Sequence, residues 1–479
     1  MKKSLLMTTA LVAAFSATNV CAEDWTISSK ETITDELISK DNVTIATDGD
    51  ITISGNNSGI ISNGNFTMED GSLTASSNGG SADTGVFVRD ENSSATIKNG
   101  TINLTEARIA KGEEDTDTTG DVNISGGKIT LNNQAYIEMY DTNTGSVNLS
   151  GGELNINDNS GILLDGANNF MMTGGTLTAT SNGNSADTGV FVKGDGADIN
   201  IQDGDINLTD SRIYKGNDTA TSGDINISGG NITLNKNAYI EMRKENTGNV
   251  NMTGGKLVLN ENSGLLLNTN DNQEIDGNAI KLIVNGDDAT ITANGSNQIS
   301  GDIDFTKGTI TVANGANLTS GDIAMKSENT KIDLSGKLDT NVSGSGNLCF
   351  KNSAANISGN VTGSNLTFEA DHSLSKAIGG TISNITALNV RKGTLTYDKD
   401  TGSIGNVSVA GGAGLDIGTN KLTATTVDFA DNSTLGLKVA SADNYGQINA
   451  NTIKIGNDTT MKVTLDSGVV ANGETKDFN

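Results

Sequence analysis

The chain repeats itself at two lengths, and this periodicity restricts the possible fold more than any other feature. Residues 66–169 recur almost in full at 170–272, offset by 104 residues at Ser81 and by 103 at Gly120. Within each block a shorter unit recurs, because VNISGG from Val122 is followed 25 residues later by VNLSGG from Val147. Duplicated segments that absorb a one-residue slip between their parts are typical of solenoids.

Each short unit contains three runs in which apolar residues alternate with polar ones. In the unit that starts at Val122 the apolar positions are Val122/Ile124, Ile129/Leu131 and Ile137/Met139. A period of two predicts strands with one buried face, and it excludes an amphipathic helix. Asn123, Ser125, Thr130 and Glu138 are then expected to face solvent. Gly-Gly pairs separate the first two runs, where a corner needs a positive φ or a close backbone approach.

Three strands and three turns in about 25 residues predict one coil of an all-β, right-handed parallel β-helix. At about 4.8 Å per coil, residues 23–479 would form roughly 18 coils and a rod on the order of 85 Å long. The complete absence of proline fits a chain paired along most of its length, since proline cannot donate to a ladder. Stacked Asn and Ser side chains are expected to form ladders between coils. Beyond about residue 275 the period loosens, although the alternation persists.

The first residues have the features of an export signal. Lys2 and Lys3 precede a short apolar run, and Val20-Cys21-Ala22 supplies small residues for cleavage, so residues 1–22 are predicted to be a signal peptide. No later apolar stretch reaches membrane-spanning length. Cleavage would leave Cys349 as the only cysteine, and it is expected to be a small buried strand residue without a disulfide.

The chain is strongly acidic, with a formal net charge of −27. Binding to nucleic acid or to anionic lipid requires a basic face, so this charge argues against both kinds of partner. Solubility and repulsion between neighbouring copies are the expected consequences.

The export signal, the imperfect coils and the final segment together resemble the passenger domain of bacterial autotransporters. LTATTVDFADNSTL from Leu422 and YGQI from Tyr445 are similar to the stretch that precedes the membrane barrel in this family. The resemblance implies a β-helical passenger over residues 23–421, a folding-assisting segment over 422–479, and display on a Gram-negative cell surface or release from it. We expect this chain, which stops at Asn479, to lack the C-terminal barrel that would attach it to the outer membrane.

The residues that most resemble catalytic groups do not form a plausible active site. Asp371-His372-Ser373 contains the letters of a triad, but neighbouring residues on a strand face opposite ways, so His372 is predicted to be an ordinary surface or turn residue. Glu138 and its repeat Glu241 are the candidate acid and base. Because they occur identically in both blocks, we expect them to be structural and predict no catalytic residues and no cofactor.

Two further motifs suggest ligands. Gly411-Gly412-Ala413-Gly414-Leu415-Asp416 matches a calcium-binding nonapeptide, but it occurs once and such motifs bind metal in tandem, so no metal site is predicted. An ice-binding face would need regular outward threonines. The outward residues that follow the Gly-Gly corners do not form regular rows of threonine, so no ice-binding face is predicted. These outward pairs are Lys128/Thr130, Glu153/Asn155, Asn231/Thr233 and Lys256/Val258.

The sequence therefore predicts a non-enzymatic surface rod of adhesin type. Its expected partner is a host glycan, a host protein or a sister copy on another cell. The segment from Lys111 to Asp115, and its counterpart from Lys215 to Asp218, is the most protruding candidate loop, although we favour a solvated acidic turn. The alternative is a secreted carbohydrate-active enzyme, either a polysaccharide lyase or a hydrolase, on the same fold.

Overall fold

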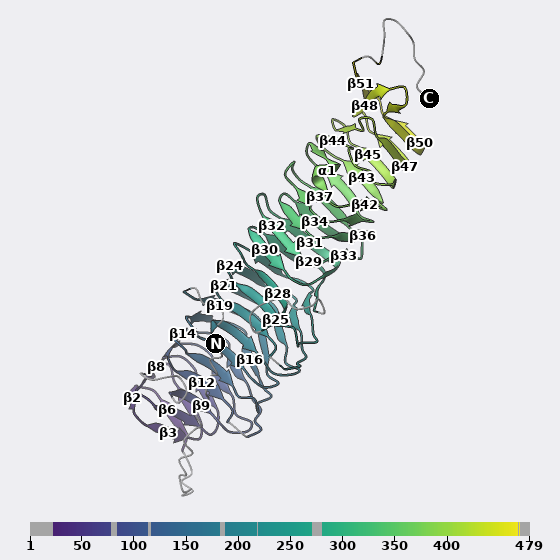
Figure 1. Cartoon of the computed structure of the whole chain (residues 1–479). Coiled ribbons are helices and arrows are strands. Elements are labelled where there is room, and N and C mark those ends of the chain that lie inside the picture. The colour runs from purple at the N-terminus through teal and green to yellow at the C-terminus, as the bar shows by residue number, and fades with distance from the viewer. Residues whose placement is uncertain are drawn as a thin grey trace.

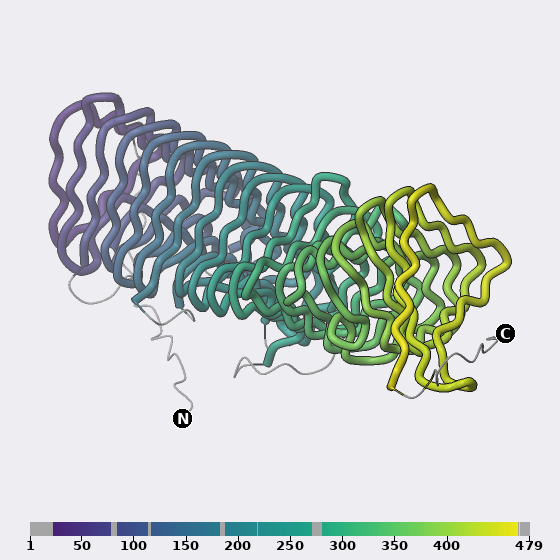
Figure 2. The backbone as a smooth tube through the Cα atoms, turned by 90° about the horizontal axis from the view of Figure 1, so that it is seen from above, coloured from purple at the N-terminus to yellow at the C-terminus, as the bar shows by residue number. Residues whose placement is uncertain are grey.

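The computed structural model of the chain describes residues 23–77, 84–113, 116–182, 187–217, 219–270, 280–467 and 469. The predicted signal peptide, residues 1–22, lies outside these ranges. The described chain winds into a parallel β-solenoid of about 18 turns, so the predicted β-helix is confirmed. Figures 1 and 2 show the coils stacked in chain order from one end of a straight rod to the other.

Each coil places one strand in each of three columns, which we call columns 1, 2 and 3. Columns 1 and 2 belong to one sheet of 31 strands, because several strands run through the corner between them. The strands of column 1 alone are β1 (Trp25–Ile27), β4 (Val43–Ile45), β7 (Phe66–Met68), β10 (Ala95–Ile97), β13 (Val122–Ile124), β16 (Ser146–Leu149), β23 (Ile225–Ile227), β26 (Val250–Met252), β33 (Ile323–Met325), β36 (Val342–Gly344), β39 (Val361–Thr362) and β42 (Ile382–Ser383).

Column 2 follows the first corner and has the same number of separate strands. They are β2 (Lys30–Thr34), β5 (Asp50–Ser54), β8 (Ser72–Ser76), β11 (Thr101–Thr105), β14 (Lys128–Asn132), β17 (Glu153–Asn157), β24 (Asn231–Asn235), β27 (Lys256–Leu259), β34 (Thr330–Leu334), β37 (Asn347–Phe350), β40 (Asn365–Phe368) and β43 (Ala387–Val390). The strands that span columns 1 and 2 are β19 (Asn169–Thr180), β21 (Ile199–Thr209), β29 (Leu282–Ala293), β31 (Ile303–Val312), β45 (Ser403–Val409), β47 (Lys421–Phe429) and β50 (Gln447–Ile455).

Column 3 completes each coil. Its 14-stranded sheet contains β3 (Leu37–Lys40), β6 (Gly59–Ser62), β9 (Gly85–Val88), β12 (Arg108–Lys111), β15 (Tyr136–Met139), β18 (Gly161–Leu164), β20 (Gly189–Val192), β22 (Arg212–Lys215), β25 (Tyr239–Arg243), β28 (Gly264–Thr269), β30 (Ser296–Ile299), β32 (Asn317–Ser320), β35 (Lys337–Asp339) and β38 (Asn356–Ile357). A six-stranded sheet and one short helix follow: β41 (His372–Ser373), α1 (Leu374–Ala377), β44 (Thr394–Thr396), β46 (Gly414–Asp416), β48 (Thr434–Ser441), β49 (Asn444–Tyr445) and β51 (Thr460–Leu465).

The core is one continuous column of apolar side chains inside the coils. It runs from Ile27 to Leu435, and most of its members are fully buried. The predicted inward residues of the 25-residue unit are confirmed, since Val122 and Ile129 lie in register with Val147 and Leu154 of the next coil. At the far end, several inward-facing side chains of β50 and β51 are exposed, with Ile455 at 62% and Met461 at 57%.

Glycine makes the corner between columns 1 and 2 possible. Gly127 and Gly152 have φ values of 78° and 76°, as the Gly-Gly pairs predict. A Cβ atom on Gly152 would lie 2.6 Å from the carbonyl carbon of Gly126 in the previous coil. Any other residue would therefore be strained both by its own backbone conformation and by the adjacent coil.

Polar side chains link the coils along the rod, and the predicted asparagine ladders are present. Asn148 donates to Asn123 at 2.9 Å, and Asn260 donates to Asn235 at 2.8 Å. A second ladder precedes column 1, where a side-chain oxygen accepts from the backbone N–H at the equivalent position of the next coil. Its acceptors are Asp24, Asn42, Asn65, Ser94, Asp121, Asn169, Asp198, Asp224, Asn249, Asp302, Asn341 and Asn360. We call it the backbone-accepting ladder.

Candidate functional site

The outer side of column 3 holds a cluster of arginine, tyrosine and glutamate side chains, which are types that commonly take part in binding or catalysis. The chain contains five arginines and six tyrosines. Most of them lie in, or directly after, column 3 strands of the two repeat blocks: Arg89, Arg108, Arg212, Arg243, Tyr136, Tyr140, Tyr214 and Tyr239. We call this set the arginine–tyrosine face. Sequence reasoning did not identify it, although the clustering of these rare residues in two homologous blocks was a usable signal.

The first repeat block contains a buried ion pair on this face. Arg108 of β12 donates through Nη1 to Oε2 of Glu138 in β15, one coil further on. The two side chains are 12% and 11% exposed, so the expectation that Glu138 faces solvent is wrong. It points away from the core, as predicted, but it is covered. Burial raises the pKa of Glu138, and the Arg108 guanidinium opposes that rise.

The second block repeats the pair in a still more enclosed form. Arg212 of β22 donates to Glu241 of β25 at 2.5 Å, and the side chains are 9% and 1% exposed. The Thr269 hydroxyl donates to the other Glu241 oxygen at 2.9 Å. The guanidiniums of Arg212 and Arg243 lie 5.6 and 5.2 Å from the centre of the Tyr214 ring. These contacts satisfy the carboxylate and fix its orientation.

The structure separates the two glutamates that sequence reasoning considered as an acid and a base. Glu138 lies in β15 and Glu241 in β25, four coils apart in the column 3 sheet. At about 4.8 Å per coil this separation is on the order of 19 Å. Carboxyl groups that act on one glycosidic bond are about 5–10 Å apart. Glu138 and Glu241 therefore cannot act on the same bond.

A buried lysine occupies the end of a column 3 strand in each block. Lys111 and Lys215 are fully buried, and their ammonium groups donate to the backbone carbonyls of Asp90 and Gly194, both at 3.0 Å. Burial lowers the pKa of each to about 8. Both residues were expected to start a protruding loop, and this expectation is wrong because alternation turns their side chains inward. Glu114, Asp115 and Asp218 of those loops lie outside the described residues.

His372 is a buried residue, which corrects the prediction of a surface or turn position. Its side chain is enclosed in the coil, edge-on to the stacked rings of Phe350 and Phe368, at centroid distances of 5.9 and 5.8 Å. Nε2 lies 2.7 Å from the carbonyl oxygen of Ala355, and Nδ1 accepts from the Ser373 backbone N–H at 2.9 Å. Both ring nitrogens contact backbone groups, so the imidazole is fixed in position and contributes to the packing of the core.

Cys349 is buried, as predicted, and lies on the outer side of column 2. Its sulfur is 3.5 Å from Oε1 of Glu369, and Lys351 donates to that carboxylate at 3.1 Å. Burial and the Glu369 charge raise the pKa of the thiol, while Lys351 acts in the opposite direction. A thiol with a raised pKa is a poor nucleophile at neutral pH.

The glycine-rich motif from Gly411 forms the corner before β46. Oδ1 of Asp416 accepts from the backbone N–H of Gly418 at 2.9 Å, so this carboxylate closes a turn. Among the described residues, no group of three or more His, Cys, Asp or Glu side chains is arranged to hold a metal ion. No helix in the described ranges is long and apolar enough to cross a membrane.

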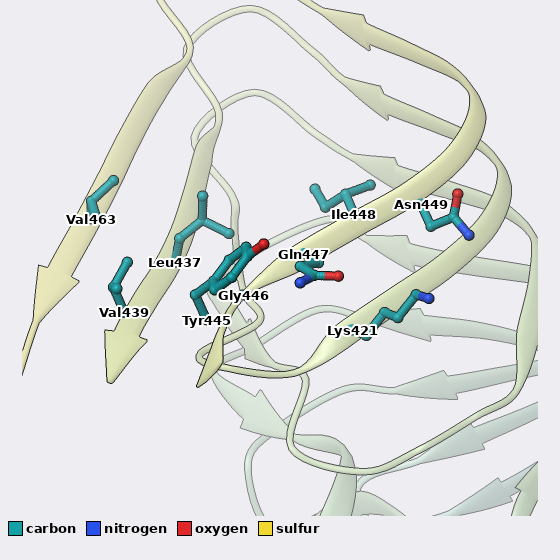
Figure 3. A pocket seen from close by; sticks show the side chains of 9 residues that line it. All are labelled: Lys421, Leu437, Val439, Tyr445, Gly446, Gln447, Ile448, Asn449 and Val463. Carbon is teal, nitrogen blue, oxygen red and sulfur yellow. The ribbon is translucent and has the colours of Figure 1, made fainter. Parts of the chain in front are cut away.

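A shallow hollow lies at the C-terminal end of the stack, around the β48–β49 hairpin (Figure 3). Lys421, Tyr445, Gln447 and Asn449 supply the polar side chains of its lining, between the aliphatic side chains of β48 and β51. The lining contains no carboxylate, cysteine or histidine among the described residues. The hollow therefore lacks the pair of carboxyl groups that glycoside hydrolysis usually needs.

Comparison with known proteins identifies no relative: neither a protein-family model nor a curated sequence matches the chain. By its structure the molecule is a parallel β-solenoid of about 18 turns, with duplicated ion pairs on one face.

Proposed function

We propose that the protein is an exported, non-enzymatic rod that mediates adhesion or cell-cell contact, in the manner of an autotransporter passenger. The repeated coil is the observation that carries this proposal. A structure built by duplicating four coils extends a surface and its reach, and it needs no new chemistry to do so. Display on a cell surface, or release from it, follows from the predicted signal peptide.

The state of the ionisable groups supports a role other than catalysis. Both candidate glutamates are paired with arginines of the same face and are largely buried. Catalytic carboxyl groups must reach a substrate and exchange protons with it. Pairs that recur at equivalent coils are better explained as contacts that hold the column 3 sheet together.

The proposed partner is a host glycan, a host protein surface or a sister copy. The net charge of −27 disfavours nucleic acid and anionic lipid. Attachment to an outer membrane would depend on a barrel beyond the present sequence.

Adhesion of coated beads to cells tests this proposal directly. Beads carrying the purified full chain are expected to attach to epithelial layers or to one another, above the level of beads carrying heat-unfolded chain. Attachment no greater than that of the unfolded control, on every cell type and between beads, would contradict the adhesive role.

A carbohydrate-active enzyme is the second candidate, and one observation favours it. Glu138 has a raised pKa, and Asp165 lies near enough to contribute to that rise. The Asp165 carboxylate pairs with Lys193 at 3.2 Å. Position 268, the counterpart of Asp165 in the second block, is Asn, so this second acid occurs in one block alone. Release of reducing ends or unsaturated products from a polysaccharide panel, abolished by Glu138→Gln, would establish the enzyme.

A further inference from the structure

The outer side of column 2 carries few charged side chains in the first two thirds of the rod. In each coil from β2 to β31 it presents a middle residue and a last residue, both half-buried or exposed. The middle row, in register from coil to coil, is Thr32, Thr52, Thr74, Asn103, Thr130, Asn155, Thr178, Asn207, Thr233, Val258, Thr292 and Thr311. We call this surface, together with its last row, the hydroxyl–amide face.

The last row has the same chemistry. It begins with Thr34, Ser54, Ser76 and Thr105, which lie in register with one another. It continues as asparagine and threonine, for example Asn132 and Thr180. The sequence argument against a regular outward array compared the first and middle positions of each strand. The register shows that the middle and last positions form the more uniform pair of rows.

Tight corners border this face at β14, whereas eight residues separate β8 from β9 and β19 from β20. Glycines with positive φ stand immediately before the column 2 strands, as Gly127 does before Lys128. On the other side, the left-handed pair Asn133 and Gln134 leads from β14 into column 3 within three residues. At β14 no loop rises from either border to cover the strand. Twelve coils at about 4.8 Å and strands about 17 Å long give a surface on the order of 900 Å².

The charge of the face differs from that of the molecule. Within the strands from β2 to β31, the middle and last rows contain no ionisable side chain. The first row contributes Lys30, Lys128 and Lys256 against Asp50, Glu153 and Asp205, which is net neutral. Lys128 and Glu153 also pair at 3.0 Å. A rod of charge −27 thus carries a long face without net charge.

We propose that the hydroxyl–amide face is a docking surface for an uncharged polysaccharide, an inference that rests on the proposed adhesive function. Rows of hydroxyl and amide groups donate and accept hydrogen bonds at a regular spacing, which suits a polymer with repeating hydroxyl groups. These rows contain no Trp, Tyr or Arg in the strands concerned, so they lack the anchors of a protein interface. A second copy would bring another −27 rod alongside, whereas an uncharged polymer avoids that repulsion.

Native gels cast with soluble polysaccharides provide the test. We expect dextran, yeast mannan or galactomannan to retard the full chain equally at low and high salt, and alginate to have no effect. Thr52→Arg/Thr130→Arg/Thr178→Arg is expected to weaken binding by at least about 10-fold, roughly 1.4 kcal/mol or more. The matched control is Thr44→Arg/Thr96→Arg/Thr362→Arg on column 1. It adds the same charge to outward positions and should bind like the unmodified chain.

Three outcomes would overturn the inference. The first is that none of the uncharged probes retards the folded chain, and the second is that both triple variants lose binding equally. The third is dimerisation in analytical ultracentrifugation that is lost only in the column 2 variant, which would assign the face to a second copy. Bead adhesion that persists in the column 2 variant would refute this inference and leave the adhesive function standing. Absence of adhesion by every form would refute the function itself.

Discussion

The duplicated coils, from Phe66 to Leu267, and the later coils, from Ile303 to Phe429, solve the same stacking problem differently. In the duplicated part, equivalent residues are 23–29 residues apart within the first block, as for Val122 and Val147. In the later part, Ile303, Ile323 and Val342 follow at intervals of 20 and 19. The change of period in the sequence thus reflects shorter coils in the later part.

The two parts also differ in where their ion pairs lie and in which side chains fill the core. The duplicated coils bury Arg–Glu pairs on the outer side of column 3. The later coils carry a half-buried ladder on column 2, in which Lys351 lies between Asp333 and Glu369. Their core is also more aromatic, with Phe350 and Phe368 stacked at 4.7 Å. The shorter, later coils therefore depend more on the packing of aromatic rings and less on buried ion pairs than the duplicated coils do.

The largest expected effect is in the aromatic core of the later coils. Phe368 is fully buried, stacked on Phe350 and in edge contact with His372, so Phe368→Ala should lower the free energy of unfolding by about 4 kcal/mol. Leu131→Ala in the duplicated coils is the matched change and should cost about 3 kcal/mol. Hydrogen exchange should place each loss in its own part of the rod. Equal losses of protection in both parts would show that the rod unfolds as one unit.

A second comparison concerns buried and exposed carboxylates. Glu241→Ala leaves Arg212 without its carboxylate in an enclosed position, and we expect a loss of about 3 kcal/mol. Glu369→Ala removes a partner of Lys351 from the more exposed ladder and should cost less than about 1 kcal/mol. Urea unfolding at neutral pH measures both. Similar losses would mean that solvent reaches the Arg212–Glu241 pair.

The buried lysines predict an unusual pH dependence of the duplicated coils. Burial lowers the pKa of Lys111 from 10.5 to about 8, so the folded state binds this proton less tightly than the unfolded chain. Stability should therefore rise as the pH increases from about 8 towards 10.5. Lys111→Met should stabilise the protein by about 2 kcal/mol at pH 7 and reduce this rise. Lys98→Met, at an exposed pair with Glu69, is the control and should change neither quantity.

The smallest expected effect is in the asparagine ladders. Asn148→Ala removes one hydrogen bond to Asn123 and should cost about 1 kcal/mol. Thr362→Val, which removes the hydroxyl contact with Ser383 in a later coil, should cost about 0.5 kcal/mol or less. A loss near zero at Asn148, measured by thermal unfolding, would show that water replaces the ladder contact without penalty.

The fold was predictable because the signals that define it are local and repeated. Alternation at Ile129 and Leu131, and glycine before Lys128, specify strand, face and corner without knowledge of the neighbouring coil. The backbone-accepting ladder was not predicted, although Asp, Asn or Ser stands before nearly every column 1 strand. Its pattern becomes obvious only when coils of unequal length are aligned by register.

The environments of individual side chains were less predictable. The alternation correctly predicts that Glu138 points away from the core. The side chain is nevertheless buried by residues of neighbouring coils, such as Arg108, which the local pattern does not reveal. Lys111 was predicted to begin a protruding loop. The strand continues through it, and its ammonium reaches the carbonyl of Asp90. His372 was judged from its sequence neighbours, whereas its surroundings are set by Phe350 and Ala355 of the preceding coil.

The backbone-accepting ladder also gives the rod a mechanical direction. Each oxygen accepts from the coil that follows it, as Asp198 does from Asp224, so a finished coil offers an open acceptor to the next. Tension that reaches the coils before Thr381 would break one such contact, together with one turn of strand pairing, at a time. Releasing a 20-residue coil frees about 65 Å of chain while the rod shortens by about 4.8 Å. Under load the molecule would therefore yield in regular steps, as a tether that lengthens coil by coil.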